Sequence, residues 1–277
     1  GGSQGAKIFD EIIHESILKI SQTNSLKIIH QTNKKNIDFL RNFYSENKIE
    51  NMVFNFDQNL DLLLNQSDFR TTLFTTANFA DHFSSSIKYL SNKHEIASHT
   101  YYHSFFEIEH LQSSRLKLEQ ITDKQVTGLR MPRMKQVPMD AIKRAGYVYD
   151  ASMNPTWLPG RYNHLSKPRT YFVDQEMFRI PASVSCNLRL PLFWLSFKNF
   201  PYTYYLHLCK MALKKDGYLS LYFHPWEFVD VTGYGLPAYT TKYAGGQLLD
   251  RLYQLLEDLK LHGNFSTMQQ FASDHTL

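Results

Sequence analysis

Apolar residues in the first part of the chain switch between helical and strand spacing. Residues 7–20 carry apolar side chains at helical intervals and predict an amphipathic helix. Strands are predicted at residues 26–30 and 51–56, with a helix at residues 36–46 between them. A further helix is predicted at residues 57–64, with Asp57 as its N-cap. This β-α-β-α order is typical of a parallel sheet.

The alternation continues from residue 71 to the end of the chain. Strands are predicted at residues 72–75, 95–98, 126–130 and 147–149, and helices at residues 81–90, 111–121 and 139–145. A short segment at residues 178–181, a helix at 202–214, a strand at 218–223 and a final helix at 246–261 follow. Polar clusters come at the strand ends, which is where a barrel of parallel strands collects its catalytic residues.

Charge and composition narrow the classes of partner. The net charge is +4, but the lysines and arginines are scattered along the chain, so we expect no nucleic-acid partner. No uninterrupted apolar stretch reaches about 18 residues, and the first residues lack the features of a signal peptide. The two cysteines fit no metal spacing and no disulfide framework. We therefore expect a cytoplasmic protein.

The first polar cluster contains two histidines, His99 and His103, directly after a predicted strand. Two imidazoles four residues apart can point at one cation, as a divalent metal such as zinc requires. Two histidines with ordinary surface or core partners would produce the same spacing, so both interpretations stay open at this point.

Three further clusters carry candidate functional groups. Arg130 ends a predicted strand and is followed by Pro132, so it could orient a carboxylate or serve as a structural salt-bridge partner. Asp150 follows another predicted strand. His224 comes after an apolar strand and is suited to general-acid work.

Taken in this order and spacing, the clusters resemble the polysaccharide deacetylase family with the NodB homology domain. The resemblance covers about residues 70–277 and rests mainly on the segments 71–74, 94–99 and 224–227, with support from 161–164, 167–171 and 180–183. It implies an α/β fold with a distorted NodB-type (β/α) barrel, whose completeness stays open.

The resemblance also implies roles for these residues. His99 and His103 would bind a divalent metal, with zinc as the expected ion, and Arg130 would orient the general base. His224 would protonate the leaving amine, and Asp150 would be a supporting residue of the catalytic group. The implied reaction is hydrolysis of the amide of an N-acetylated cell-envelope saccharide.

One motif of that family is missing from this sequence. The family opens with a strand that ends in a Thr-Phe-Asp-Asp type motif, which supplies the general base and a metal ligand. Asp57 could replace the lost metal aspartate, although an N-cap role explains it as well. We therefore expect an impaired deacetylase-like protein, and the alternative is a non-catalytic saccharide-binding pseudoenzyme.

The N-terminal segment resembles a different family, the C-terminal part of the MurG-type N-acetylglucosaminyltransferase, over about residues 1–68. Its glycine-rich start, residues Gly1, Gly2, Ser3, Gln4 and Gly5, precedes a helix and could bind the diphosphate of a nucleotide sugar. A flexible terminus would look the same. The expected domains are a glycosyltransferase-like fragment with Rossmann-like β-α-β-α order at 1–68 and a deacetylase-like barrel at 69–277, which makes the chain a chimera. A third functional reading is thus a transferase remnant that binds UDP-N-acetylglucosamine.

An aromatic-rich segment at residues 191–205 leaves a further alternative open. It could dock at a membrane interface to reach a lipid-linked sugar, which would place the protein at the inner membrane, or it could pack over the barrel.

Overall fold

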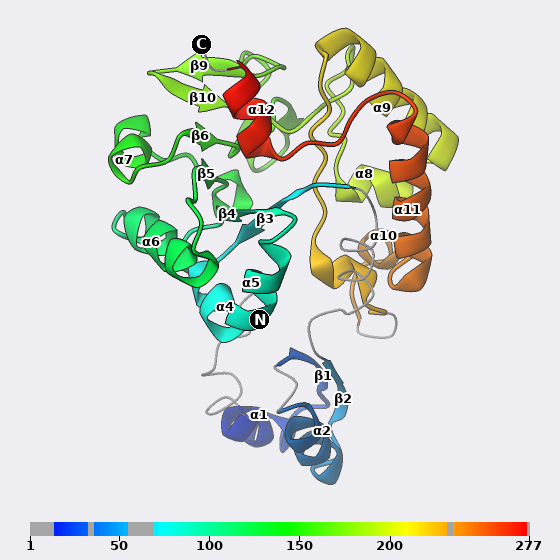
Figure 1. Cartoon of the computed structure of the whole chain (residues 1–277). Coiled ribbons are helices and arrows are strands. Elements are labelled where there is room, and N and C mark those ends of the chain that lie inside the picture. The colour runs from blue at the N-terminus through cyan, green and yellow to red at the C-terminus, as the bar shows by residue number, and fades with distance from the viewer. Residues whose placement is uncertain (1–13, 33–35, 55–68, 232–234, 276–277) are drawn as a thin grey trace.

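A computed structural model describes residues 14–32, 36–54, 69–231 and 235–275 of the chain. Two groups of elements follow each other along the sequence (Figure 1). The first comprises two helices and two strands before residue 55. The second contains the remaining elements, from residue 69 onward.

The first group is a small parallel β-α-β unit. Strands β1 (Lys27–Gln31) and β2 (Glu50–Phe54) pair in parallel, with helix α2 (Ile37–Glu46) as their crossover. Helix α1 (His14–Ser21) precedes them. The small core contains Leu40, Tyr44, Ile49 and Val53. The β-α-β order predicted from the sequence is confirmed. Residues 7–13 of the first predicted helix and the predicted helix at 57–64 lie outside the described residues.

A mostly parallel sheet of six strands organises the second group. The strand order is β3 (Thr72–Thr75), β4 (Glu95–Ser98), β5 (Gly128–Leu129), β6 (Tyr149–Asp150), β10 (Met177–Arg179) and β9 (Phe172–Asp174). All neighbours are parallel except β9, which forms an antiparallel hairpin with β10. The predicted α/β class is confirmed.

Four helices form one core with this sheet. They are α4 (Ala77–His82), α5 (Ser84–Leu90), α6 (His110–Thr122) and α7 (Met139–Arg144). The prediction of one helix at residues 81–90 is wrong in part, because two helices cover this region and the first begins earlier. The chain leaves helical geometry at Phe83, whose φ is −117° and ψ is 41°. Thr76 caps α4 by accepting a hydrogen bond from the Phe79 N–H at 3.3 Å.

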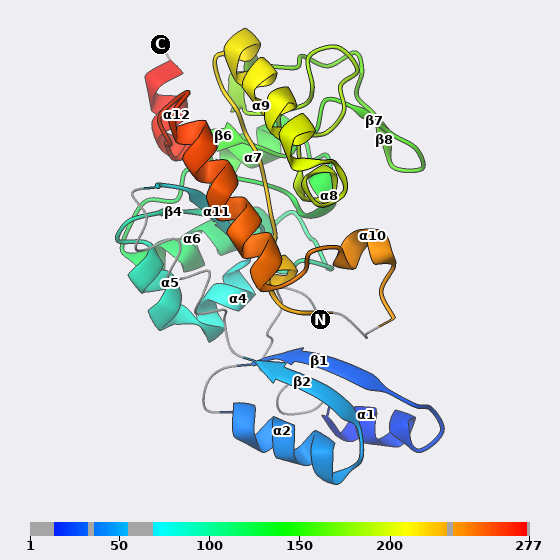
Figure 2. The same cartoon turned by 90° about the vertical axis from the view of Figure 1, so that its right-hand side faces the viewer.

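A second core lies between helices on the other side of the sheet (Figures 1 and 2). It is built by α8 (Trp194–Asn199), α9 (Tyr202–Asp216) and α11 (Gly246–Lys260). Phe197 and Tyr205 of the aromatic-rich segment are fully buried there, whereas Tyr204 is 45% exposed. Packing therefore accounts for the central aromatic residues of the segment. Within the parts of the chain that the structure describes, every helix is too short or too polar to cross a bilayer.

The predicted strand at residues 218–223 is wrong. This stretch is extended but joins no sheet: the Ser183 N–H donates to the Ser220 carbonyl at 2.9 Å, whereas the Ser220 N–H donates to the Ser183 hydroxyl at 2.9 Å. The Ser183 hydroxyl thus accepts the second hydrogen bond, which in a sheet would go to a backbone carbonyl. The six-stranded sheet ends at β3 and β9, so within the described residues its strands do not close into a barrel.

The remaining elements are short. A hairpin of β7 (Trp157–Leu158) and β8 (Tyr162–Asn163) stands apart from the sheet, and the 3₁₀ turns η2 (Pro132–Met134) and η3 (Pro225–Phe228) follow β5 and the 218–223 stretch. Helix α10 (Ala238–Thr241) precedes α11. The last helix, α12 (Met268–His275), begins at the amino ends of β3 and β4, where Thr72 and Glu95 accept hydrogen bonds from the Met268 and Gln269 N–H groups.

Candidate active site

Strand β4 carries His99 to the carboxyl edge of the sheet. The strand is buried along its whole length, and the His99 N–H donates to the Thr75 carbonyl of β3 at 2.9 Å. The Nδ1 atom of His99 lies 2.6 Å from the Arg130 carbonyl oxygen. Because a carbonyl only accepts, Nδ1 carries the proton and Nε2 keeps its lone pair. Burial lowers the pKa of His99 to about 3, so the imidazole is neutral, as a metal ligand must be.

His103 returns to His99 through a turn at Thr100. Thr100 adopts a left-handed conformation with φ 64°, and its N–H donates to the Ser98 hydroxyl at 3.1 Å. The ring centroids of His99 and His103 are consequently 5.4 Å apart. Burial lowers the pKa of His103, and the positive charge of Arg133 and the proximity of His224 lower it further. The structure thus brings the two predicted metal ligands together.

Arg130 lies inside the open barrel between two aromatic rings. Its guanidinium carbon is 4.5 Å from the Phe74 ring centroid and 5.3 Å from that of Tyr222, and its Nε donates to the Ala151 carbonyl at 3.1 Å. Burial lowers its pKa. Its buried Nη2 has no hydrogen-bond partner among the residues that the structure describes. No ion pair joins Arg130 to a carboxylate of the described residues, and its predicted role of orienting a base stays a prediction.

Asp150, the next predicted site residue, lies in a buried network of an ion pair and hydrogen bonds. It is 1% exposed and forms an ion pair with Arg179 at 2.9 Å. Its Oδ1 accepts hydrogen bonds from the N–H and the hydroxyl of Ser152, and the Ser152 hydroxyl accepts from the Met131 N–H at 2.7 Å. Burial raises the pKa of Asp150, and Arg179 partly offsets this effect. Asp150 therefore connects β6 to the turn that follows Arg130, and its predicted role as a supporting residue of the catalytic group stays a prediction.

His224 faces the same region from the other side and has a buried carboxylate partner. Its Nδ1 and its backbone N–H both lie 2.8 Å from Oε1 of Glu227. The His224 side chain is 43% exposed, whereas Glu227 is fully buried. The second carboxylate oxygen of Glu227 lies 3.6 Å from Nζ of Lys198, which is also fully buried. No role was predicted for Glu227 or Lys198. The His-x-x-Glu spacing of His224 and Glu227 could have indicated the contact between these two side chains.

A catalytic zinc needs three protein ligands, and the two predicted ones that lie among the described residues are His99 and His103. The part of the chain with described coordinates holds no group of three His, Cys, Asp or Glu side chains arranged for a metal. Asp57, the predicted third ligand, lies outside the described residues, as do Gly1, Gly2, Ser3, Gln4 and Gly5. Their predicted roles therefore stay predictions.

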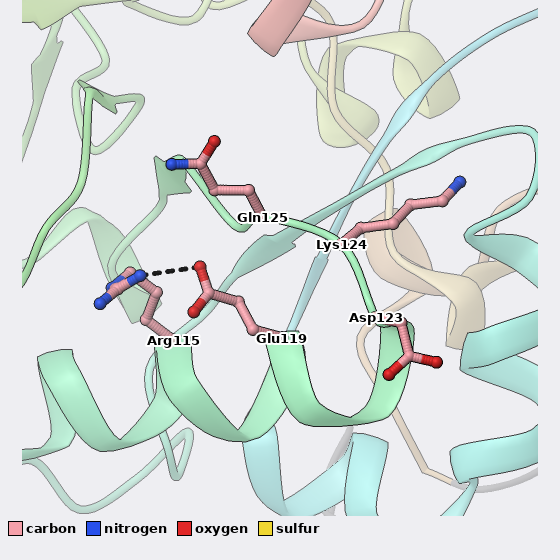
Figure 3. Close-up of a pocket in the computed structure, with 5 residues that line it drawn as sticks. All are labelled: Arg115, Glu119, Asp123, Lys124 and Gln125. Carbon is pink, nitrogen blue, oxygen red and sulfur yellow. Dashed lines mark hydrogen bonds and ion pairs between the residues drawn. The ribbon is translucent and has the colours of Figure 1, made fainter.

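A surface hollow of about 390 Å³ lies elsewhere, at the end of α6 (Figure 3). Arg115, Glu119, Asp123, Lys124 and Gln125 line it. Glu119 accepts hydrogen bonds from Arg115 at 2.7 Å and from the Val126 N–H at 3.0 Å. The hollow borders the segment that enters β5, so it lies toward the amino ends of the strands, opposite the histidines.

Sequence comparison assigns the N-terminal segment to a known domain type. Residues 1–70 match the model of the glycosyltransferase family 28 C-terminal domain. Over 68 residues the chain is 35% identical to the UDP-N-acetylglucosamine–N-acetylmuramyl-(pentapeptide) pyrophosphoryl-undecaprenol N-acetylglucosamine transferase of Pelagibacter ubique, and over 69 residues 45% identical to that of a Nitratiruptor species. These matches cover 24% and 25% of this chain, and only 19% and 20% of the relatives. The predicted transferase-like segment is confirmed.

Structural comparison identifies the fold of the larger part. A Mycobacterium smegmatis structure assigned as a polysaccharide deacetylase superposes with a TM-score of 0.53, covering 78% of this chain and 75% of that one. At 14% sequence identity, this similarity shows the fold. The predicted NodB-type fold is confirmed.

Proposed function

We propose that this protein is a deacetylase-like protein that acts on an N-acetylated saccharide of the cell envelope. The observation that carries the proposal is the convergence of His99, His103, Arg130 and His224 at the carboxyl edge of the sheet of a deacetylase-type fold. Strand ends of this kind position catalytic groups on many α/β scaffolds. The transferase relatives, whose names specify N-acetylglucosamine transfer, support a saccharide of that class.

The three histidines each have a defined part in the proposed amide hydrolysis. His99 and His103 offer two neutral imidazoles to a divalent metal, for which zinc is the best candidate, with Asp57 as the third ligand. Such an ion would polarise the acetamide carbonyl and acidify a water. His224 would donate a proton from Nε2 to the leaving amine, because Glu227 occupies its Nδ1.

The bound-metal content of the purified protein tests this proposal. We expect one zinc per wild-type chain and loss of that zinc in Asp57→Ala and in His103→Ala. His110→Ala is the matched control, because His110 lies on the same side of the sheet at the start of α6. Acetate release from a chitin oligosaccharide should follow the metal content. A metal-free wild-type protein without acetate release would overturn the proposal.

A non-catalytic saccharide-binding function is the second candidate. It is favoured by the absence of a third metal ligand among the described residues. A pseudoenzyme would bind the same oligosaccharide without releasing acetate. Isothermal titration beside the acetate assay separates the two functions.

The N-terminal segment has its own proposed role, the binding of a nucleotide sugar. Its match to a transferase domain supports a site for UDP-N-acetylglucosamine at Gly1–Gly5. Because the relatives' names specify an undecaprenol-linked acceptor, a lipid-linked saccharide and contact with the cytoplasmic face of the membrane belong to the same proposal. Binding of UDP-N-acetylglucosamine in preference to UDP-glucose, lost on deletion of residues 1–68, would support it. Equal binding of both nucleotides would oppose it.

A further inference from the structure

Glu227 and Lys198 form a buried ion pair directly behind His224. Both side chains are fully buried, and their charged atoms are 3.6 Å apart. Lys198 donates from Nζ to the Thr240 carbonyl at 2.9 Å and lies over the rings of Trp194 and Trp226, at 5.5 and 5.1 Å from their centroids. The lysine is thus held by contacts from three segments: α8, η3 and α10.

Such a pair carries a free-energy cost that calls for an explanation. Removing two charges from water costs several kcal/mol per ion, and an apolar pair of similar volume often stabilises a protein as well or better. Burial lowers the pKa of Lys198, and Glu227 only partly offsets this effect. Of the His224, Glu227 and Lys198 side chains, the half-exposed His224 is the one that reaches solvent.

The carboxylate determines which nitrogen of His224 is available. Oε1 of Glu227 accepts from the backbone N–H of His224 and lies 2.8 Å from its Nδ1. A carboxylate has no proton to donate, so Nδ1 must carry one, and Nε2 becomes the nitrogen that exchanges protons. The Lys198 ammonium lies on the other side of this carboxylate, 3.6 Å from its second oxygen. The Trp226 ring, tilted 24° from the imidazole plane, and the Trp194 ring, at 83° to it, border the imidazole.

We propose that Glu227 and Lys198 are positioning residues that fix the tautomer and the orientation of His224, so that Nε2 is the nitrogen that exchanges protons. This inference rests on the proposed function for its catalytic consequence, but the tautomer itself is independent of that function. The rival explanation is that the pair only holds the η3 turn against α8.

The experiment compares wild-type protein with Lys198→Met/Glu227→Leu, which replaces the ion pair by two apolar side chains of similar size. This double change avoids leaving one charge buried alone, so the fold should persist. Lys242→Met is the matched control, because Lys242 is an exposed lysine that lies over the ring of Tyr243 at the end of α10. Long-range ¹H–¹⁵N NMR of ¹⁵N-histidine-labelled protein reads the tautomer, and the spectrum of His224→Gln assigns the signal among the 12 histidines.

We expect neutral His224 to carry its proton on Nδ1 in wild type and in Lys242→Met, and to lose this preference in the double variant. With a chitin oligosaccharide as substrate, kcat for acetate release should fall about 10²-fold in the double variant while KM changes little, because general acid catalysis contributes about 10²–10⁴-fold. A wild-type proton on Nε2, or a folded double variant that keeps the wild-type tautomer, would overturn the inference. Absence of acetate release from wild type would count against the proposed function alone, since the NMR result stands without it.

Discussion

The imidazole of His99 and the backbone carbonyl of Arg130 are joined by a 2.6 Å contact between adjacent strands. This contact orients His99 at the end of β4, whereas His103 lies beyond the turn at Thr100; both side chains are half-buried. The two proposed metal ligands therefore differ in what they contribute to the fold. Removing His99 takes away a half-buried ring and leaves the Arg130 carbonyl without its donor, which are two separate costs.

The first prediction separates metal binding from stability. His99→Ala should lower the free energy of unfolding by about 2–4 kcal/mol, whereas His103→Ala should change it by about 1 kcal/mol or less. Both variants should lose the proposed metal. Urea unfolding of metal-free protein beside metal analysis checks this prediction. Equal destabilisation by both variants would show that His99 has no special structural role.

The second prediction concerns Asp150, whose predicted role was catalytic support. Asp150→Asn leaves Asp174, at 3.6 Å, as the remaining carboxylate near buried Arg179 among the described residues, so the free energy of unfolding should fall by about 3 kcal/mol. The control is Asp140→Asn, which breaks an exposed pair with Arg144 on α7 and should cost about 0.5 kcal/mol or less. Urea midpoints that move equally in both variants would contradict the structural role of Asp150.

The sequence predicted the local parts of this structure better than its long-range contacts. Residues 72–75 and 95–98 form strands as predicted, because their apolar runs are bounded by polar residues and pair with each other. The run at 218–223 has the same appearance, yet Ser220 pairs with Ser183 through one backbone bond and one bond to the serine hydroxyl, which accepts from the Ser220 N–H. A pattern of apolar residues cannot show which acceptor a distant segment will offer.

In the candidate site, too, local features were predicted and long-range contacts were not. His99, His103, Arg130 and His224 were found because each follows a strand or an extended run. The contact between Lys198 and Glu227 depends on the packing of α8 against η3, which no local spacing encodes. The left-handed turn at Thr100 could not be predicted from the sequence either, because threonine rarely adopts a positive φ.

The third prediction concerns Gly128 at the centre of the sheet. A β-carbon at this position would lie 2.1 Å from Cζ and Oη of Tyr149, a ring that is fully buried. Gly128→Ala must displace that ring and should lower the free energy of unfolding by about 1–3 kcal/mol. Gly263→Ala is the control, since its nearest contact would be an ordinary 3.7 Å to Leu213. Thermal unfolding of both variants is the measurement, and a Gly128→Ala midpoint equal to that of the control would refute the close contact.

The fourth prediction concerns Glu95, which connects β4 to α12 and to Tyr149. Its Oε2 accepts from the Thr72 hydroxyl at 2.6 Å and from the Gln269 N–H at 3.0 Å, and its Oε1 accepts from the Tyr149 hydroxyl at 2.7 Å. Burial raises the pKa of Glu95 above its ordinary value of 4.5, and these hydrogen bonds offset only part of the effect. The folded chain thus keeps the Glu95 proton over a pH range in which the unfolded chain has released it.

The sign of the pH effect follows from this difference. The contribution of Glu95 to stability is largest below about pH 4.5 and declines as the pH rises from there to the folded-state pKa, after which it is constant. Glu95→Gln removes this decline. It also replaces one carboxylate oxygen by an NH2 group, so at least one of the three donors loses its acceptor. The variant should therefore be less stable than wild type by about 1–3 kcal/mol at pH 4.5 and by a smaller margin at pH 7. Urea unfolding at both pH values measures the margin, and a margin that widens toward neutral pH would mean that the pKa of Glu95 is lowered in the folded protein rather than raised.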